Sequence, residues 1–390
     1  MNMKKTIKDY DLNGKKVIIR CDFNIPMNNG VILDDTRIRA SIKTIRYAIN
    51  NGASVILLSH LGRVKTDEDK KCNSLYPVSL ALSNILKKEV LFSPETRGKE
   101  LSRMVSELQS GDILLVENTR FEDIDGNKES KCDKRLSKYW ASLGDIYIND
   151  AYGTCHRNHA SVTGIPLYIP SGIGFLVERE IKKINGILEL NTHPFITILG
   201  GKKIEDKTKL IESLVKISDK LIIGGAMSFT FLKVLGYNTG KCIISEDNLS
   251  FCKKILDNYK EKIILPVDFV CEDAIKEIDE FDDNDIGYDI GPKTIRLFDR
   301  ELKDAKRVIL NGPMGMFEDS RYANGTRKVF NILGKYKIKT VIGGGDSASA
   351  VNNLGFNDLF YHVSTGGGAT MKYLEDRKLV GIEVIEDAEK

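Results

Sequence analysis

Short runs of β-branched and aliphatic residues alternate with longer helix-like patterns along the whole chain, and this alternation constrains the fold most. The strand-like runs include "VIIR" (17–20), "SVILLS" (54–59), "FITIL" (195–199) and "TVI" (340–342). Strands separated by helical segments indicate parallel sheets covered by helices. At 390 residues the chain is long for a single hydrophobic core. We therefore predict an α/β protein with two domains whose sheets are largely parallel.

Charge and cysteine usage exclude several classes of protein. The 58 basic and 55 acidic residues are interspersed and give a formal charge of only +3, so no bulk affinity for nucleic acid is expected. The seven cysteines form no C-x-x-C pair, which favours reduced thiols, and only the adjacent Cys155 and His156 offer a weak alternative as metal ligands. No run has the length of a membrane span, and the first residues lack the apolar core of a signal peptide. We expect a cytoplasmic protein without a membrane partner, and a monomer by default.

In the first half of the chain, four strand-like runs end in cationic and polar residues. These residues are Asp22, Asn24, His60, Arg63, Arg120, His156 and Arg157. In parallel sheets, ligands gather at the carboxyl ends of the strands. Arginine binds carboxylate and phosphate in a bidentate manner, so this edge suits a small, multiply charged anion. Asp22 and Asn24 would suit a hydroxyl group on that anion.

The segment "DDTRIRA" (34–40) looks like a helix start that brings two more arginines near this edge. Arg37 and Arg39 are two residues apart and cannot share a helical face. One of them is expected to point at the ligand and the other to support the structure.

In the second half, the strand-like runs end in glycines instead. Such endings occur at 200–201, 224–225, 312, 343–345 and 366–368. Glycine lets backbone N–H groups approach a ligand closely, and a helix N-terminus just after it attracts phosphate. Lys203 and Lys207 are four residues apart, so both could face one side if a helix starts there. Asp346 lies inside one glycine loop, which makes sense if a divalent cation bridges it to phosphate.

These features leave three classes of function to weigh. Gly343, Gly345 and Ala348 satisfy the G-x-G-x-x-A pattern of dehydrogenases, but Asp358 comes too soon after them to be the usual ribose acid. A non-catalytic metabolite sensor would not need Asp346 together with the cations Arg37 and Lys203. An anion site in one domain and a site for nucleotide phosphates and a metal in the other fit phosphoryl transfer best.

The whole chain resembles the phosphoglycerate kinases. Eleven sequence blocks between positions 20 and 370 match that family in its order: "RCDFNIP", "DDTRIRA", "SHLGR", "ENTRF", "DAYGTCHRNHAS", "GGKKIEDK", "GGAMSFTF", "DIGPKT", "NGPMGMFE", "GGGDSASA" and "HVSTGGGAT". The resemblance implies reversible phosphoryl transfer between 1,3-bisphosphoglycerate and ADP, giving 3-phosphoglycerate and ATP, in glycolysis and gluconeogenesis. It also implies Mg²⁺ as the cofactor of the nucleotide and a carboxyl group as the acceptor.

The resemblance implies roles for individual residues as well. Those that would hold 3-phosphoglycerate are Asp22, Asn24, Arg37, His60, Arg63, Arg120, His156 and Arg157. Those on the nucleotide side would be Lys203, Lys207, Asn311, Glu318, Gly343, Gly344, Gly345, Asp346 and Ser347, with Glu318 at the ribose and Asp346 at the magnesium. Arg37, Lys203, Gly367 and Gly368 would stabilise the group in transfer.

The resemblance further implies a domain plan of two doubly wound parallel-sheet, Rossmann-like domains joined by a helix. Residues 1–172 would bind 3-phosphoglycerate, residues 173–188 would form a connecting helix, and residues 189–374 would bind the nucleotide. A C-terminal tail of about 375–390 would pack back on the first domain, and the domains would close a cleft over both substrates. The chain departs from the family pattern at Lys202, where a small residue is usual, at Lys372, where an acid is usual, and in "LEDRK" (374–378), where a glycine often follows "LE".

Overall fold

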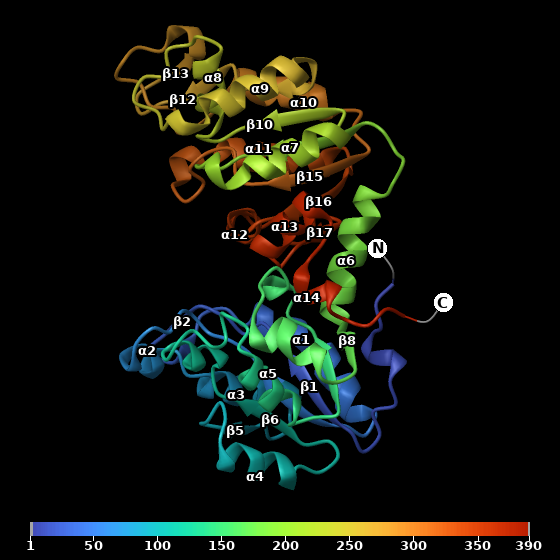
Figure 1. Cartoon of the computed structure of the whole chain (residues 1–390). Helices are drawn as coiled ribbons and strands as arrows, with labels where there is room; N and C mark the ends of the chain where they lie inside the picture. The colour runs from blue at the N-terminus through green and yellow to red at the C-terminus, as the bar shows by residue number, and fades with distance from the viewer. Residues whose placement is uncertain (1–2, 389–390) are drawn as a thin grey trace. The chain divides into compact units, whose positions relative to one another are not determined.

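The computed structural model of the chain describes residues 3–388. They form two compact units, one made of residues 3–181 and 378–388 and the other of Lys182–Arg377 (Figure 1). The division falls inside helix α6 (Phe175–Leu188). Among the described residues, no helix combines the length and the apolar character needed to cross a membrane.

The first unit is built on a parallel six-stranded sheet. Its strands, in spatial order, are β5 (Leu91–Ser93), β6 (Ile113–Val116), β4 (Ser54–Leu58), β1 (Lys16–Arg20), β7 (Ile146–Asn149) and β8 (Ser171–Ile173). The helices of this unit, besides the start of α6, are α1 (Thr36–Asn50), α2 (Asp67–Cys72), α3 (Tyr76–Leu86), α4 (Lys99–Glu107), α5 (Lys134–Ala141) and α14 (Val380–Glu383). A hairpin of β2 (Met27–Asn28) and β3 (Val31–Ile32) follows β1. Strands β4, β6 and β7 are buried along their whole length, which is why they are continuous apolar runs without alternation.

The second unit repeats this plan. Its parallel sheet contains, in order, β11 (Ile263–Ile264), β10 (Lys220–Ile223), β9 (Phe195–Leu199), β15 (Arg307–Asn311), β16 (Lys339–Gly343) and β17 (His362–Val363). Its main helices are α7 (Thr208–Ile217), α8 (Ser228–Val234), α9 (Leu249–Tyr259), α10 (Pro292–Leu302), α11 (Asn324–Lys335), α12 (Gly345–Leu354) and α13 (Gly368–Asp376). A small antiparallel sheet of β13 (Ile275–Glu277), β12 (Asp268–Val270) and β14 (Asp289–Ile290) adds a second apolar cluster, in which the rings of Phe229 and Phe269 lie 4.4 Å apart.

Both sheets reverse their strand order beside a central strand. In the first unit the chain passes from β1 to β4 and its neighbours on one side, and then to β7 and β8 on the other side. In the second unit it passes from β9 to β10 and β11, and then to β15, β16 and β17. The predicted doubly wound α/β architecture is confirmed. The carboxyl ends of the two strands at each reversal leave a crevice, which is where such folds bind ligands.

The end of the chain joins the first unit, and in Figure 1 the red helix α14 lies among its blue and green elements. The Gly381 N–H donates to the carbonyl of Cys155 (2.8 Å), and the Asn149 side chain donates to the carbonyl of Gly381 (2.8 Å). A Cβ at Gly381 would lie 2.6 Å from a methyl group of Val162, so the close approach requires glycine there. Residues 389 and 390 of the predicted tail lie outside the described residues.

A buried carboxylate holds the beginning of α6. Asp150 follows β7, and its Oδ1 accepts hydrogen bonds from the N–H groups of Leu176 (2.8 Å) and Val177 (3.4 Å). These are donors of the first helical turn, which have no partner inside the helix. Burial raises the pKa of Asp150 to about 7, although the hydrogen bonds and the charge of Arg179 oppose the rise. The ionised form is therefore costly inside the folded protein.

Replacing Asp150 by asparagine should change how stability depends on pH. The pKa of Asp150 is higher in the folded than in the unfolded chain, so its favourable contribution is complete at low pH and is lost as pH rises through about 7. Asparagine cannot ionise. The free energy of unfolding of Asp150→Asn, relative to that of the wild type, should therefore increase between pH 5 and pH 8 in urea titrations. A difference that is the same at every pH would contradict this explanation.

Candidate functional site

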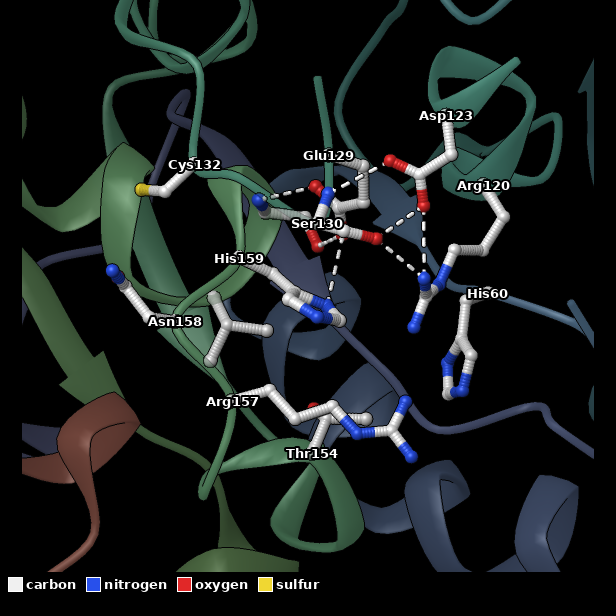
Figure 2. A network of polar contacts seen from close by, with 12 residues as sticks. His60, Arg120, Asp123, Glu129, Ser130, Cys132, Thr154, Arg157, Asn158 and His159 are labelled. Carbon is white, nitrogen blue, oxygen red and sulfur yellow. Dashed lines mark hydrogen bonds and ion pairs between the residues drawn. The ribbon is translucent and has the colours of Figure 1, made fainter. Parts of the chain in front are cut away.

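Cationic side chains converge at the strand reversal of the first unit. Arg20 ends the central strand β1, where it lies in register with Leu58 of β4 and Asn149 of β7. Figure 2 shows His60, Arg120 and Arg157 facing one region, with His159 close beside them. Burial lowers the pKa of Arg157, and the charges of Arg120, Arg20 and Arg63 lower it further. Several positive charges thus lie close together, which favours an anionic ligand.

Arg120 lies in a 3₁₀ helix (Thr119–Asp123) and is held on one side only. Its Nη1 donates to Asp123 Oδ2 (2.8 Å) and to Ser130 Oγ (2.5 Å), and the Ser130 N–H donates to Asp123 Oδ1 (2.8 Å). The Nε of Arg120 is buried and has no hydrogen-bond partner among the described residues. A buried donor without a partner is costly, so this N–H is suited to a ligand.

The predicted Asp22, Asn24 and Arg37 form one connected group. Arg37 Nη1 donates to Asp22 Oδ2 (3.0 Å) and to the Asn24 carbonyl (3.1 Å). Its side chain keeps 35% of its surface exposed. Helix α1 begins at Thr36, as the sequence predicts, and Arg39 pairs with Asp35 on an exposed face of that helix. Of the two arginines, Arg37 therefore lies with the anion-site residues.

His60 lies buried between these groups. Burial lowers the pKa of His60 well below its ordinary value, and the charges of Arg20, Arg157 and Arg120 lower it further. The nearest acid is Asp22, whose Oδ1 is 4.0 Å from His60 Nδ1. The imidazole is therefore neutral at physiological pH and can donate only one ring N–H.

His156 and Arg63, both predicted, surround this cluster less tightly. His156 is half-buried, and its Nε2 accepts a hydrogen bond from Arg157 Nε (3.4 Å). Arg63 is exposed. A metal role for Cys155 with His156 finds no support, because Cys155 is fully buried and its Sγ donates to the Ala151 carbonyl (3.5 Å). Within residues 3–388 no three His, Cys, Asp or Glu side chains are grouped to hold a metal ion.

The sequence analysis placed Arg20 at the polar tip of its strand but gave it no role in the site, and it did not single out His159. Both are buried, with exposed fractions of 0% and 7%. Burial lowers the pKa of His159 to about 3, and the charges of Arg120 and Arg20 contribute. Arg20 is the last residue of the strand-like run "VIIR", so the strand-end rule applied to the other cations could have found it.

A cavity of about 600 Å³ opens at the strand reversal of the second unit. Gly201 after β9 and Pro313 after β15 line it where the two strands end. Apolar surface comes from Phe229, Phe269 and Tyr288, of which Tyr288 stacks on Tyr322 with 4.6 Å between the ring centroids. A largely apolar cavity with a few polar groups is typical of small-molecule sites.

Two residues predicted for the nucleotide side, Glu318 and Asp346, line this cavity. Lys202, for which the sequence suggested no role, also lines it, as do Lys241 and Tyr288, which the sequence analysis did not single out. Asp346 lies exposed in the first turn of α12. Mg²⁺ is commonly bound by one or two carboxylates and by substrate phosphates, so the Asp346 carboxylate fits a nucleotide-bound magnesium.

The expectation that Lys203 and Lys207 share a helical face is wrong. A 3₁₀ turn spans Glu205–Lys207, and α7 begins only at Thr208, so the two lysines are not in one α-helix. Lys203 is exposed. Lys207 instead turns inward, where its Nζ donates to the carbonyls of Gly200 (2.5 Å) and Asn311 (3.2 Å). Burial lowers the pKa of Lys207 to about 8, against the charges of Asp346 and Asp206.

Asn311 and Ser347 connect the ends of β15 and β16 and do not line the cavity. Asn311 Nδ2 donates to the Gly343 carbonyl (3.0 Å), and Ser347 Oγ accepts from the Gly312 N–H (2.6 Å). Gly344 has a φ of +93°, and a Cβ there would lie 2.6 Å from Asn311 Nδ2. These contacts fix the turn that starts α12.

The predicted glycines lie at two helix N-termini. Gly345 is the first residue of α12, directly after Gly343 and Gly344. Gly367 precedes α13 with a φ of +49°, and Gly368 is the first helical residue. Both helix ends present N–H groups without a partner inside the helix, which suit phosphate oxygens.

The first unit thus has a cation cluster suited to a small anion, and the second has a cavity lined by Asp346 and Glu318 together with glycines at two helix starts. This combination fits a phosphotransferase. The family model for "Phosphoglycerate kinase" matches residues 7–377. The chain is 49% identical to the phosphoglycerate kinase of Macrococcus caseolyticus, with 99% of this chain and 100% of that protein covered. It is also 49% identical to that of Enterococcus faecalis, with coverages of 98% and 99%.

Solved structures of phosphoglycerate kinases also match the fold of this chain. The structure of phosphoglycerate kinase from Coxiella burnetii matches with a TM-score of 0.87 and 33% identity, covering 98% of both chains. That of the enzyme from Pyrococcus horikoshii matches with a TM-score of 0.84 and 28% identity, covering 97% of this chain and 98% of that chain. The chain belongs to the phosphoglycerate kinase family. The dehydrogenase alternative, which rested on the G-x-G-x-x-A pattern alone, has no support from these relatives.

The inward position of Lys207 predicts that nucleotide affinity depends on pH. With a pKa of about 8 without ligand, Lys207 is charged below pH 8 and loses its proton above it, so binding of phosphates should weaken as pH rises from 7 to 9. Arginine keeps its charge over this range. Calorimetric titration with Mg-ADP should show a steeper loss of affinity above pH 8 for the wild type than for Lys207→Arg.

The matched control is Lys216→Arg, a substitution at an exposed lysine of α7. It should follow the wild-type pH dependence. Identical profiles for all three proteins would show that Lys207 does not bind the phosphates.

Proposed function

We propose that the chain catalyses reversible phosphoryl transfer between 1,3-bisphosphoglycerate and ADP, producing 3-phosphoglycerate and ATP, as the carboxyl-acceptor phosphotransferase of glycolysis and gluconeogenesis. Membership of the phosphoglycerate kinase family supports this reaction. The observation that carries the proposal is the cation cluster around His60, where the buried Nε of Arg120 has no hydrogen-bond partner within residues 3–388. An acid bearing phosphate supplies the negative charge and the acceptors that this cluster lacks.

The first unit would hold the phosphoglycerate. The proposed contacts come from Asp22, Asn24, Arg37, His60, Arg63, Arg120, His156 and Arg157, to which the structure adds Arg20 and His159 as neighbours. Asp22 is already paired with Arg37 and restrains its guanidinium. Since arginine offers a fork of N–H donors, Arg37 can keep this pair and still bind an oxygen of the substrate.

The second unit would hold the nucleotide. The proposed residues are Lys203, Lys207, Asn311, Glu318, Gly343, Gly344, Gly345, Asp346 and Ser347. The aromatic and apolar lining of the cavity suits a nucleobase, and Glu318 on the same cavity suits the ribose hydroxyls. Asp346 would hold the Mg²⁺ that accompanies ATP or ADP, which neutralises charge on the phosphates.

Transfer requires no general base in this proposal, because the acceptor carboxylate of 3-phosphoglycerate carries no proton. The protein contributes by positioning and by neutralising charge. Arg37 and Lys203 would supply positive side chains, and Gly367 and Gly368 would supply backbone N–H groups at the N-terminus of α13. The cytoplasmic location, the monomeric state and a cleft that closes over both substrates stay predictions.

A coupled assay tests the proposed reaction directly. Purified protein should phosphorylate 3-phosphoglycerate with ATP only when magnesium is present, and Asp346→Ala should lose most of this activity because the metal loses its protein ligand. Asp358→Ala, which removes an exposed acid beyond α12, is the control and should be fully active. A folded wild type that binds both ligands without turnover would favour the sensor function.

Arg37→Ala should leave the fold intact and lower kcat by about 10³–10⁵, the range for an arginine that stabilises the transferred phosphoryl group. The control is Arg39→Ala, two residues later in α1, because the exposed Arg39 forms an ion pair only with Asp35 within residues 3–388. The same coupled assay measures both variants. Near wild-type turnover by Arg37→Ala would disprove the role.

A further inference from the structure

A fully buried glutamate lies behind the cation cluster. Glu129 is 0% exposed and belongs to the segment between the 3₁₀ helix of Arg120 and helix α5. Its Oε1 accepts from Ser161 Oγ (2.5 Å), and its Oε2 accepts from the Ser161 N–H (2.9 Å). His159 Nδ1 lies 3.8 Å from Oε1, as the dashed line in Figure 2 marks. None of these contacts belongs to the residues predicted to bind substrate.

Ser161 joins this carboxylate to Arg20. Arg20 Nε lies 2.8 Å from Ser161 Oγ, and a guanidinium can only donate. The serine hydroxyl therefore accepts from Arg20 and gives its single hydrogen to Glu129. Both oxygens of Glu129 then act as acceptors, and the carboxylate form can accept both hydrogen bonds. Burial raises the pKa of Glu129, but the charge of Arg20 and the two hydrogen bonds from Ser161 oppose that rise.

Arg20 continues the chain of contacts to His60. The side chain of Arg20 is 0% exposed, and its Nη2 lies 3.3 Å from His60 Nδ1. Because the arginine is the donor, Nδ1 must be the acceptor and the ring proton must be on Nε2. Asp22 Oδ1, 4.0 Å from the same nitrogen, is too far away to compete for a hydrogen. The Nε2–H of His60 is therefore available to donate a hydrogen bond to the ligand.

We propose that Glu129 is a positioning residue of the phosphoglycerate site, which acts through Ser161 and Arg20 to keep His60 in the neutral Nε2–H tautomer that donates to the bound anion. The inference rests on the proposed function, since it takes the cation cluster as the place where the phosphoglycerate binds. In this proposal Glu129 itself contacts neither substrate.

The position of Glu129 in the chain supports a positioning role. The next residue, Ser130, donates to Asp123 Oδ2 (2.5 Å) and accepts from Arg120 Nη1, so two consecutive residues orient two different cations of the site. Figure 2 shows Glu129 and Ser130 adjacent, with His159 and Arg120 reaching toward them from separate segments. Arg20 also donates from Nη1 to the Cys21 carbonyl, and an acid on its Nε side offsets the repulsion from the other cations of the cluster. Glu129 is the only buried acid that the described residues connect to Arg20 by hydrogen bonds.

The test is the ¹⁵N spectrum of the histidine side chains in the full-length protein, whose five histidines make assignment by substitution practical. The two ring nitrogens have distinct shifts in each tautomer, so the spectrum reports the position of the proton. In the wild type we expect a single Nε2–H tautomer for His60, with a shift on adding 3-phosphoglycerate. In Glu129→Gln, the amide cannot accept both hydrogen bonds from Ser161, and we expect a mixture of His60 tautomers.

The Michaelis constants of Glu129→Gln should change together with the His60 tautomer. The KM for 3-phosphoglycerate should rise about tenfold in Glu129→Gln, whereas the KM for ATP should stay as in the wild type. Ser161→Ala removes the middle contact without adding a donor and should have the same effect, which provides a second variant if Glu129→Gln does not fold.

Glu117→Gln is the matched control. Glu117 is likewise buried, and it accepts from a serine hydroxyl (Ser74 Oγ, 2.6 Å) and from two backbone N–H groups. Its substitution should lower stability comparably but leave the His60 tautomer unchanged. If it mixed the tautomers equally, the effect of Glu129 would be one of general destabilisation and the proposal would fail.

Two results would overturn different parts of the argument. In the first, the His60 signals of the wild type shift on adding 3-phosphoglycerate, but Glu129→Gln and Ser161→Ala keep the single tautomer and the wild-type KM. The positioning role of Glu129 would then be wrong, while the proposed binding site would still be supported. If the wild-type His60 signals do not respond to 3-phosphoglycerate at saturating concentration, the proposed site itself is wrong.

Discussion

Repulsion among the cations at the end of β1 is the constraint on which the first unit depends. Arginines that converge on an empty anion site destabilise the folded chain unless something holds them in place. The structure gives three of them a separate acid: Asp22 pairs with Arg37, Asp123 with Arg120, and Glu129 reaches Arg20 through Ser161. Each acid binds its arginine from one side, so the remaining donors stay available. The protein's own acids therefore hold the arginines in place, which lowers the ordering that ligand binding requires.

The second unit depends on close approach of backbone rather than on charge. A Cβ at Gly312 would lie 2.2 Å from the Gly200 carbonyl, and one at Gly225 would lie 2.4 Å from the Gly201 nitrogen. Both glycines also have a positive φ, of +97° and +65°. Three strand ends can thus pack against one another, and the carbonyls of Gly200 and Asn311 form the place where the Lys207 ammonium is held.

Much of this arrangement could be predicted from the sequence because parallel strands follow a simple rule. A strand buried on both faces is a continuous apolar run, so its end is visible, and polar residues just after it lie at the ligand edge. That rule found His60 and Arg157. It could not find Glu129, which follows no strand and lies among turns, and whose partner Ser161 is 32 positions away. The separate spacing argument misjudged Lys207, because four-residue spacing implies a shared face only in an α-helix and the chain forms a 3₁₀ turn there.

The two proposed sites use different hydrogen-bond donors, and the charges of their proposed ligands account for the difference. Arginine keeps its charge at any physiological pH and offers planar pairs of N–H groups, which suits a small acid that must be held at both its carboxylate and its phosphate. In the proposed nucleotide site, a divalent cation would already neutralise part of the phosphate charge, so backbone N–H groups at the starts of α12 and α13 would complement Lys203 and Lys207 without further arginines. Additional fixed arginines there would compete with the metal for phosphate oxygens. Lys207, whose burial lowers its pKa to about 8, is the cationic counterpart suited to such a site, since desolvation makes its positive charge easier to give up than that of an arginine.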